Sequence, residues 1–332
     1  TNLLGNTLFG SLSGSSVAAS VAIGGVFTPM EEKEGSDKKF AAAVNIASAP
    51  TGLIIPPSGI LIIYPVLAGC SVVGMIMSGY IPGLMWALAC MVVAYVIAKK
   101  NHYPTAGKVP ASVFFKYFVD AIPSLLLIVI IVGGVMSGIF TATESAAVAV
   151  AYTLFLSIVV YRSIKIKDLP KILLDACETT AVIMFLIAGS NVMSFVMSFT
   201  GLPSAIGNAL ISVSSNKYVI LLIINLVLLV VGCFMDITPA VLIFTPIFLP
   251  VVQSFGMDPI HFGIMMVMNL GIGNITPPVG SALFSGCSVA DMDMEDMIKP
   301  ILPFYAAIFV ALMLVAYVPW FSMALPTLFG AV

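Results

Sequence analysis

The chain repeats one pattern of glycine and proline at two points about 221 residues apart. Its two Pro-Pro pairs both lie in this pattern, which reads Gly52-x-x-x-Pro56-Pro57-x-Gly59 and then Gly273-x-x-x-Pro277-Pro278-x-Gly280. Three further matches follow in the same order, with a slip of four residues: Gly-Cys-Ser-Val at 69–72 and 286–289, Pro82 and Pro303, and Val-Ala-Tyr at 93–95 and 315–317. Matches that keep their order in this way indicate a duplicated unit.

The chain is too apolar to be a water-soluble domain. It is 60% hydrophobic and 8% charged over 332 residues, and its apolar runs extend over roughly 18 to 28 residues, far beyond the length of about ten that a barrel strand needs. We therefore expect an all-α polytopic membrane protein lying in a lipid bilayer. The net charge of −2 excludes a nucleic-acid partner. The five cysteines lie singly in apolar sequence, which indicates neither a disulfide framework nor a zinc site.

Apolar runs and charged breaks divide the chain into two repeats and a middle section. The first repeat is expected over 1–98, with a hairpin at 1–30, a span at 41–68 broken at Pro56-Pro57, and a span at 71–98. Residues 99–178 are expected to hold scaffold spans at about 121–141 and 145–161 and a basic amphipathic arm. The second repeat is expected over 179–332, with a span at 179–199, a hairpin at 218–255, a broken helix at 262–288 and a last span at 301–325. Roughly 100 membrane residues precede the second hairpin, so a matching segment is expected before residue 1.

The basic residues decide how the hairpins cross the membrane. If 1–30 and 218–255 both enter and leave on one side, the loops at 31–39, 99–116, 162–171 and 289–300 share a face. That face then holds 12 of the 13 Lys and Arg residues, and only Lys217 lies opposite. Because cytoplasmic loops carry an excess of Lys and Arg, two re-entrant hairpins are favoured. The repeats are then inverted relative to one another.

The two double-proline breaks predict a binding site. Each pair removes two N–H donors and frees carbonyl groups on the preceding turn, and such backbone survives at membrane depth only against protein or a water-filled cavity. Half-helix C-termini and bare carbonyls suit a small cation, whereas half-helix N-termini suit a carboxylate. One break could be a simple kink. Two breaks in inverted repeats favour a paired site for an ion and an anion.

Side-chain oxygens occur at both hairpin tips, in Ser11–Ser16 and in Asp236–Thr238. Ser and Thr there can cap a half-helix, ligate sodium, or merely allow close helix packing. Asp236 is one of two acidic residues inside apolar sequence, and it is expected to bind sodium or to cap a helix. The other, Glu144, follows Thr141 in a capping pattern. Asn191 is either a contact between helices or a substrate contact.

Several segments together resemble the large membrane subunit of the tripartite ATP-independent periplasmic (TRAP) transporters. These segments are Leu12–Ser15, Phe40–Val44, Pro50–Ser58, Phe140–Val148, Asp258–Gly263 and Thr276–Gly280. The resemblance covers essentially the whole chain. It implies an elevator fold of the ion-transporter type, in which a transport domain with two hairpins and two broken helices moves against a scaffold in a bacterial inner membrane. It also implies that about the first 90 residues of the usual subunit precede this chain.

The resemblance further implies sodium-driven uptake of an organic acid. A periplasmic substrate-binding protein would deliver the acid, and a small membrane subunit would accompany the large one. Carried over by position, the resemblance implies one sodium site at Gly10, Ser13, Gly52, Ile55 and Pro56. It implies a second sodium site at Gly232, Asp236, Gly273 and Thr276, and substrate contacts at Ser15, Ser16, Thr238 and Asn274, with Asn191 as the further candidate from its apolar span.

The substrate is expected to be sialic acid or a related sugar acid, because Asn45–Gly52 resembles members of that type. A C4-dicarboxylate is the alternative. Arg162 is the only Arg and lies in a basic loop, so recognition of an anion would depend on half-helix N-termini, hydroxyls and bound sodium. A channel would need a regular polar stripe, which the spans lack. An enzyme is disfavoured because no set of catalytic side chains lies within a span. Coupling to protons through Asp236 and Glu144 remains an alternative to sodium.

Overall fold

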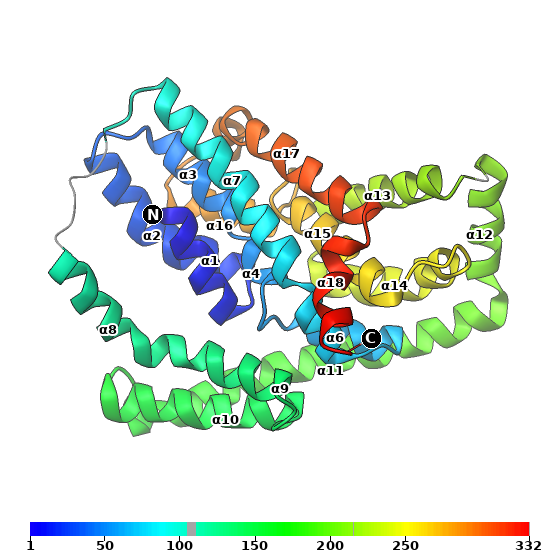
Figure 1. Ribbon diagram of the computed structural model, residues 1–332, viewed down its shortest axis with the longest axis horizontal. Helices are drawn as coiled ribbons and strands as arrows, with labels where there is room; N and C mark the ends of the chain where they lie inside the picture. The colour runs from blue at the N-terminus through cyan, green and yellow to red at the C-terminus, as the bar shows by residue number, and fades with distance from the viewer. Residues whose placement is uncertain (105–110, 215, 332) are drawn as a thin grey trace. The chain divides into compact units, whose positions relative to one another are not determined.

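The computed structural model describes residues 1–104, 111–214 and 216–331, and the described secondary structure is helical (Figure 1). Its contacts divide the chain into two units. Unit 1 comprises Thr1–Pro104 and Met193–Val332, and unit 2 comprises Thr105–Val192. Six described helical segments are long and apolar enough to cross a membrane, as the composition predicts: Val72–Lys100, Phe115–Met136, Thr143–Val160, Ile166–Met197, Lys217–Phe234 and Met294–Tyr317.

Unit 1 contains both copies of the repeated sequence. The helix boundaries of the first copy recur in the second at a nearly constant interval. The first copy consists of α1 (Asn2–Ser13), α2 (Ser16–Lys33), α3 (Lys38–Ser48), α4 (Thr51–Ile54) and α5 (Ile60–Ala68). The second consists of α13 (Lys217–Phe234), α14 (Ile237–Gln253), α15 (Pro259–Asn274) and α16 (Ser281–Val289). From the end of α1 to the end of α5, every boundary that the copies share recurs 220 or 221 residues later. The duplication read from the proline pairs therefore extends to the whole arrangement of helices.

Local capping explains why the starts of α3 and α15 coincide. Asp37 precedes α3 and Asp258 precedes α15, and each carboxylate accepts a hydrogen bond from the backbone N–H two residues later, at 3.0 and 2.8 Å. Ser15 caps α2 by accepting from the N–H of Ala18 at 3.2 Å. An N-terminal cap of this kind satisfies one of the free N–H groups of a helix end.

The double prolines interrupt helices at the expected places. The backbone leaves α4 at Ile55, and α5 begins only at Ile60; the backbone leaves α15 after Asn274, and α16 begins at Ser281. Both Pro-Pro peptide bonds are cis. The first broken helix has an additional interruption between α3 and α4, where Pro50 lies, whereas α15 runs without a break.

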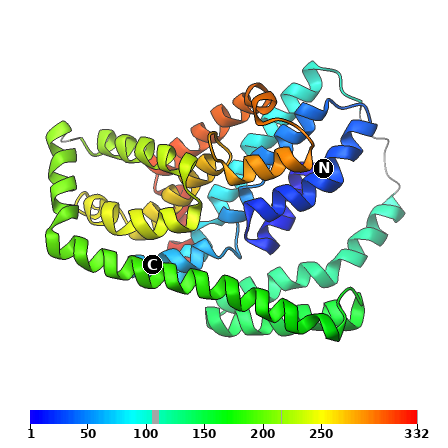
Figure 2. The same ribbon diagram turned by 180° about the vertical axis from the view of Figure 1, so that it is seen from behind.

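The two copies pack against one another in an exchanged arrangement (Figures 1 and 2). The second arm of the first hairpin, α2, lies against α16 of the second broken helix. The second arm of the second hairpin, α14, lies against α5 of the first broken helix. The buried centre between the copies contains large side chains, with Tyr64, Trp86, Phe262 and Phe304 all fully buried. Tyr64 donates to the carbonyl of Pro259 at 2.6 Å, so a polar bond also joins the copies.

The remaining helices of unit 1 are α6 (Val72–Ser78), α7 (Tyr80–Lys100), α12 (Leu202–Val213), α17 (Met294–Tyr317) and α18 (Trp320–Leu328). The single span expected over 301–325 is therefore wrong, because the helix ends at Tyr317 and Pro319 precedes a new one. Repeated Gly-Cys-Ser-Val is not structurally equivalent either. Its first copy begins with the left-handed Gly69 that ends α5, whereas its second lies inside α16. That match is a coincidence of apolar sequence.

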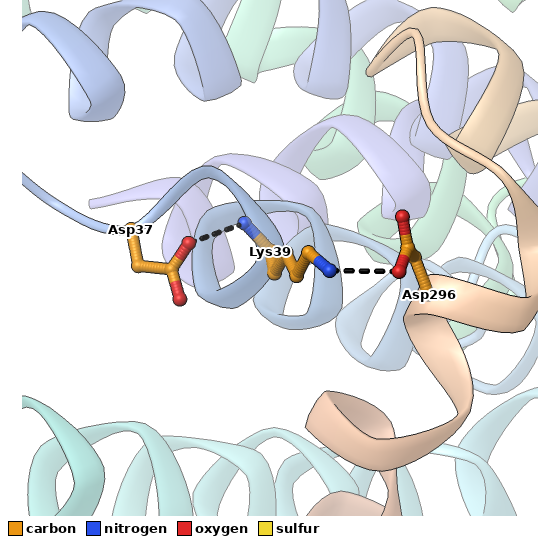
Figure 3. Close-up of polar contacts among 3 residues, drawn as sticks. All are labelled: Asp37, Lys39 and Asp296. Carbon is orange, nitrogen blue, oxygen red and sulfur yellow. Dashed lines mark hydrogen bonds and ion pairs between the residues drawn. The ribbon is translucent and has the colours of Figure 1, made fainter.

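The charged loops of unit 1 gather at one end of the bundle, as the charge distribution predicts. Lys39 at the start of α3 forms an ion pair with Asp296 in the first turn of α17, with 2.7 Å between Nζ and Oδ1 (Figure 3). Phe40 packs against Tyr103, which follows α7, with 5.2 Å between ring centroids. Lys217 lies beside Tyr218, and Tyr317, at the opposite end of α17, donates to the carbonyl of Tyr218 at 3.0 Å. Lys217 thus lies at the other end from the loops.

Unit 2 contains α8 (Ala111–Ile128), a π-helical turn η1 (Val129–Gly133), α9 (Gly134–Met136), α10 (Ala142–Phe155), a second π-helical turn η2 (Leu156–Val160), the short 3-10 turn η3 (Ile166–Asp168) and most of α11 (Leu169–Thr200). Two side-chain bonds hold α10 to the preceding segment. Ser145 donates to the carbonyl of Ile131 at 2.9 Å, and Tyr152 donates to that of Pro123 at 2.8 Å. Hydroxyls that bond across helices in this way are typical of membrane bundles.

Candidate functional site

The first hairpin and the first break meet through two glycines. A Cβ atom on Gly52 would lie 2.5 Å from the Cα of Gly10, closer than real Cβ atoms come, so the two backbones cross in direct contact. The next turn of the hairpin, at Gly14, lies against the backbone of Pro57, Ser58 and Gly59. This close approach of α1 and α4 requires the absence of side chains at the crossing.

The proline pair leaves backbone carbonyls at this crossing without their helical donors. A helix would pair the carbonyl of Gly52 with the N–H of residue 56, and Pro56 has none. Ile55 is already extended, with φ −80° and ψ 124°, and its N–H donates to Thr51. Ser13, at the end of α1, places its exposed hydroxyl 3.3 Å from both the N and O atoms of Ser15. The structure therefore brings Gly10 and Gly52 together, with Ser13, Ile55 and Pro56 on the adjoining turns.

The second hairpin and second break repeat this geometry. A Cβ atom on Gly273 would lie 2.5 Å from the Cα of Gly232. The N–H of Val279, beyond the prolines, donates to the carbonyl of Cys233 in α13 at 3.1 Å. The carbonyl of Gly273 has lost its helical donor to Pro277 and accepts instead from the N–H of Thr276 at 2.9 Å. Two crossings of the same kind thus occur, one in each copy.

Asp236 occupies the N-cap position of α14, but its carboxylate makes no capping bond. The side chain is exposed, and its Oδ1 atom accepts from the hydroxyl of Ser281 at 3.4 Å. Asp236 was expected either to bind sodium or to cap a helix, and its side chain does not cap α14. Glu144 differs, because the predicted capping box with Thr141 is confirmed: the Glu144 carboxylate accepts from the N–H of Thr141 at 2.8 Å.

A chain of polar side chains joins the two copies at the centre of the site. Asn274, the last residue of α15, donates to the hydroxyl of Ser16 in the first hairpin at 2.6 Å. Its Oδ1 atom accepts from the hydroxyl of Ser281, which begins α16 and also lies beside Asp236. The route Ser16, Asn274, Ser281, Asp236 therefore runs from one hairpin tip to the other. It has no counterpart in the first break, where the equivalent positions are Leu53 and Ile60.

The other residues expected to contact substrate lie outside this chain of hydrogen bonds. Ser15 caps α2, and Thr238 lies half-buried in the first turn of α14, beside Asp236. Asn191 lies on α11 within unit 2, and its side chain is exposed. His261 is buried in α15, and its Nε2 atom bonds to the carbonyl of Val315 at 2.8 Å.

Sequence reasoning missed three features of this region. Ser281 was not singled out, although it lies three residues after the second proline pair. Tyr305 of α17 donates to the carbonyl of Ile275 in the second break. Two pairs of buried asparagines, Asn6 with Asn45 and Asn225 with Asn269, join each hairpin to its broken helix. An isolated Asn in an apolar run was the one available signal for these pairs.

The donors at the two crossings suit a small cation held by oxygen. Backbone carbonyls and hydroxyls dominate, and among the described residues no three His, Cys, Asp or Glu side chains gather as a transition metal would need. Carbonyl, hydroxyl and carboxylate oxygens are ligands for hard cations.

Comparison with known proteins identifies the family. Residues 1–321 match the family model described as "Tripartite ATP-independent periplasmic transporter, DctM component". The chain belongs to the TRAP transporter large-permease family. It is 50% identical over 330 residues to the uncharacterized protein YgiK of Salmonella typhimurium, covering 99% of this chain and 76% of that relative.

Two further TRAP permeases differ in the substrate that their names give. The sialic acid permease SiaM of Vibrio cholerae is 38% identical over 332 residues, covering 99% of this chain and 77% of the relative. The C4-dicarboxylate permease DctM of Pseudomonas aeruginosa is 37% identical over 323 residues, covering 97% and 76%. The chain is therefore a multi-pass protein of the inner membrane and part of a TRAP transporter. These relatives are transport permeases and not enzymes, as the sequence predicts.

Proposed function

We propose that this TRAP permease takes up an organic acid together with sodium, and that the two glycine crossings are the sodium sites. The observation that carries the proposal is the repetition of one crossing in each copy, each beside a carbonyl that has lost its helical donor to proline. Gly10, Ser13, Gly52, Ile55 and Pro56 would hold one ion. Gly232, Asp236, Gly273 and Thr276 would hold the second. Half-helix ends of this kind coordinate sodium in other transporter folds.

The substrate would lie between the hairpin tips, on the polar chain that begins at Ser16. This chain presents hydroxyl and amide groups from Ser16, Asn274 and Ser281, and Ser15 and Thr238 lie on the adjoining first turns. Among the described residues of unit 1, the Lys side chains contact Asp291, Asp296 and Tyr218, and none bonds to this chain. A site rich in hydroxyls and free of cationic side chains suits a polyhydroxylated monocarboxylate, such as sialic acid, better than a C4-dicarboxylate.

Two partners complete the proposal. The family description is of a tripartite periplasmic system, so a periplasmic binding protein would deliver the acid and a small membrane subunit would accompany the permease. Alternating access would follow from an elevator movement of the copies with their hairpins. That movement predicts that a cysteine at Ser15 in a cysteine-free background reacts with a membrane-impermeant thiol reagent from both sides of the membrane in turn.

Uptake into proteoliposomes tests the function directly. The permease, its small subunit and the binding protein are reconstituted with an inward sodium gradient, and labelled sialic acid is compared with labelled succinate. We expect saturable sialic acid uptake that needs the binding protein and ceases when choline replaces sodium. Uptake that persists in choline and follows a pH gradient would instead support proton coupling. Preferential uptake of succinate would refute the proposed substrate, and uptake that does not saturate would favour a channel.

A further inference from the structure

Each hairpin is joined to its broken helix by a second, polar contact one or two turns before the glycine crossing. In the first copy, Asn6 of α1 donates from Nδ2 to Oδ1 of Asn45 at 2.8 Å and to the hydroxyl of Ser48 at 3.0 Å, both on α3. In the second copy, Asn269 of α15 donates to Oδ1 and to the backbone carbonyl of Asn225 on α13, at 2.8 and 2.9 Å. All five side chains are at most 1% exposed.

These contacts lie at the same level in both copies. Asn6 precedes Gly10 by four residues, and Ser48 precedes Gly52 by four; Asn269 likewise precedes Gly273 by four. Four residues are about one helical turn. Ser48 and Asn269 are also equivalent by the interval of 221 residues that relates the helix boundaries. The two copies therefore place a polar bond on the same side of the crossing, although they build it from different residues.

Helix pairs of this kind need a polar contact to fix their register. At a glycine crossing two backbones touch through a small, featureless surface, which by itself permits sliding and rotation of one helix on the other. A hydrogen bond one turn away adds a second, directional point of attachment. Inside an apolar bundle the bond has no competing water, and breaking it leaves buried polar atoms without partners.

Two of these asparagines have a buried amide oxygen that no described residue satisfies. Within the described part of the chain, the Oδ1 atoms of Asn6 and Asn269 are buried without a hydrogen-bond partner, while their Nδ2 atoms face several acceptors. Burying an amide oxygen without a partner is unfavourable. The side chains are therefore held in place for their N–H donors, which supports a positioning function over general packing.

We propose that the Asn6–Asn45 and Asn225–Asn269 pairs are positioning residues that set the sodium affinity of the crossing in their own copy. Neither pair touches the ion. Each pair fixes how its hairpin and its broken helix are aligned along their length. It thereby fixes where the free carbonyl of Gly52, or the groups around Gly273, lie relative to the hairpin tip. This inference depends on the proposed sodium sites. Loss of groups that orient ligands commonly weakens metal binding by about 10- to 100-fold.

Sodium titration of thermal stability tests the inference without knowledge of the substrate. The purified permease complex is titrated with sodium chloride against choline chloride, and the half-saturating sodium concentration is read from the shift in melting temperature. Asn6→Leu removes the donor while keeping the same branched arrangement of side-chain heavy atoms. Asn269→Ser is the milder variant, because Ser48 occupies the equivalent position. We expect each to raise the half-saturating concentration by about tenfold. The matched control is Ser78→Ala, whose buried hydroxyl bonds only within α6.

Double variants assign each pair to its own crossing. Asn6→Leu combined with Ser13→Ala should give less than the product of the two fold-changes, because both act on the first crossing; combined with Thr276→Ala the fold-changes should multiply. If the wild-type complex shows no sodium response, the proposed sodium sites fail. If the wild type responds but Asn6→Leu and Asn269→Ser only lower the melting temperature, with unchanged half-saturation, the pairs are merely structural and the inference is refuted.

Discussion

Substituting Gly52 by alanine should show whether the backbone crossing is needed for sodium binding. The added Cβ would lie 2.5 Å from the Cα and 2.7 Å from the carbonyl carbon of Gly10. Carbon atoms pack at about 3.5 to 4.0 Å, so α1 and α4 must separate by about 1 Å. Both neighbours are backbone atoms and cannot rotate away as a side chain could. Forced overpacking of this kind costs about 1 to 3 kcal/mol.

The same displacement should weaken the ion site more than it weakens the fold. Metal sites tolerate changes in ligand distance of only about 0.2 Å, several times less than the separation that the methyl group imposes. We expect Gly52→Ala to raise the half-saturating sodium concentration at least tenfold, equivalent to about 1.4 kcal/mol. Gly232→Ala should be milder, because its Cβ would lie 3.1 Å from the Cα of Gly273.

Gly59→Ala is the matched control for this experiment. Gly59 lies in the same break with φ −59°, and a Cβ there would meet nothing within 4 Å. It should leave the sodium titration unchanged and stabilise the protein by about 0.4 to 1 kcal/mol through the unfolded state. Both quantities come from one thermal titration in detergent. Wild-type half-saturation in Gly52→Ala, with a normal melting temperature, would refute the argument that close backbone approach builds the site.

Three further changes probe other parts of the chain. Asp236→Asn should raise the half-saturating sodium concentration at an unchanged melting temperature, since its carboxylate makes no capping bond; equal loss of both would indicate a structural function. Thr141→Ala removes a cap in unit 2 and should cost about 1 kcal/mol of stability without altering the sodium titration. Burial raises the pKa of Glu31, which lies at the charged end of α2. The folded state then holds this proton more tightly, so stability should fall as pH rises from the ordinary pKa through the raised one. Melts between pH 4 and 8 should show this fall, and Glu31→Gln should flatten it.

Proline made the overall arrangement readable from the sequence. A residue without an N–H cannot continue a helix, so both breaks and both hairpins fall where the Pro-Pro pairs and tip motifs predict. Apolar composition alone does not show where a helix ends. The coincidental Gly-Cys-Ser-Val match and the missed end of α17 at Tyr317 both arose because apolar runs look alike. The helix α12 escaped prediction because it is short and contains Pro203, Gly207 and Asn208, residue types that are common in loops.

Contacts across the bundle could not be predicted from the sequence. Gly10 and Gly232 entered only through family resemblance, because a glycine in an apolar helix does not reveal which backbone it touches. The asparagine pairs could not be predicted for the same reason. A lone Asn in a span fits a packing contact, a substrate contact or a partner on any neighbouring helix, and only the fold shows that Asn6 faces Asn45.

The differences between the copies support a division of labour within the site. Features needed at both crossings are duplicated, namely the glycine contact, the proline break and the polar bond one turn earlier. The chain from Ser16 through Asn274 and Ser281 to Asp236 occurs once and connects the copies. Two ions can use a duplicated site, whereas a single asymmetric substrate cannot match a symmetric one. Ser281 lies between Asp236 and Asn274 and has one proton to donate, so a cation bound by Asp236 would leave that proton to Asn274. The second crossing would in this way influence the contact of Asn274 with Ser16, and sodium bound there would act directly on the proposed substrate site.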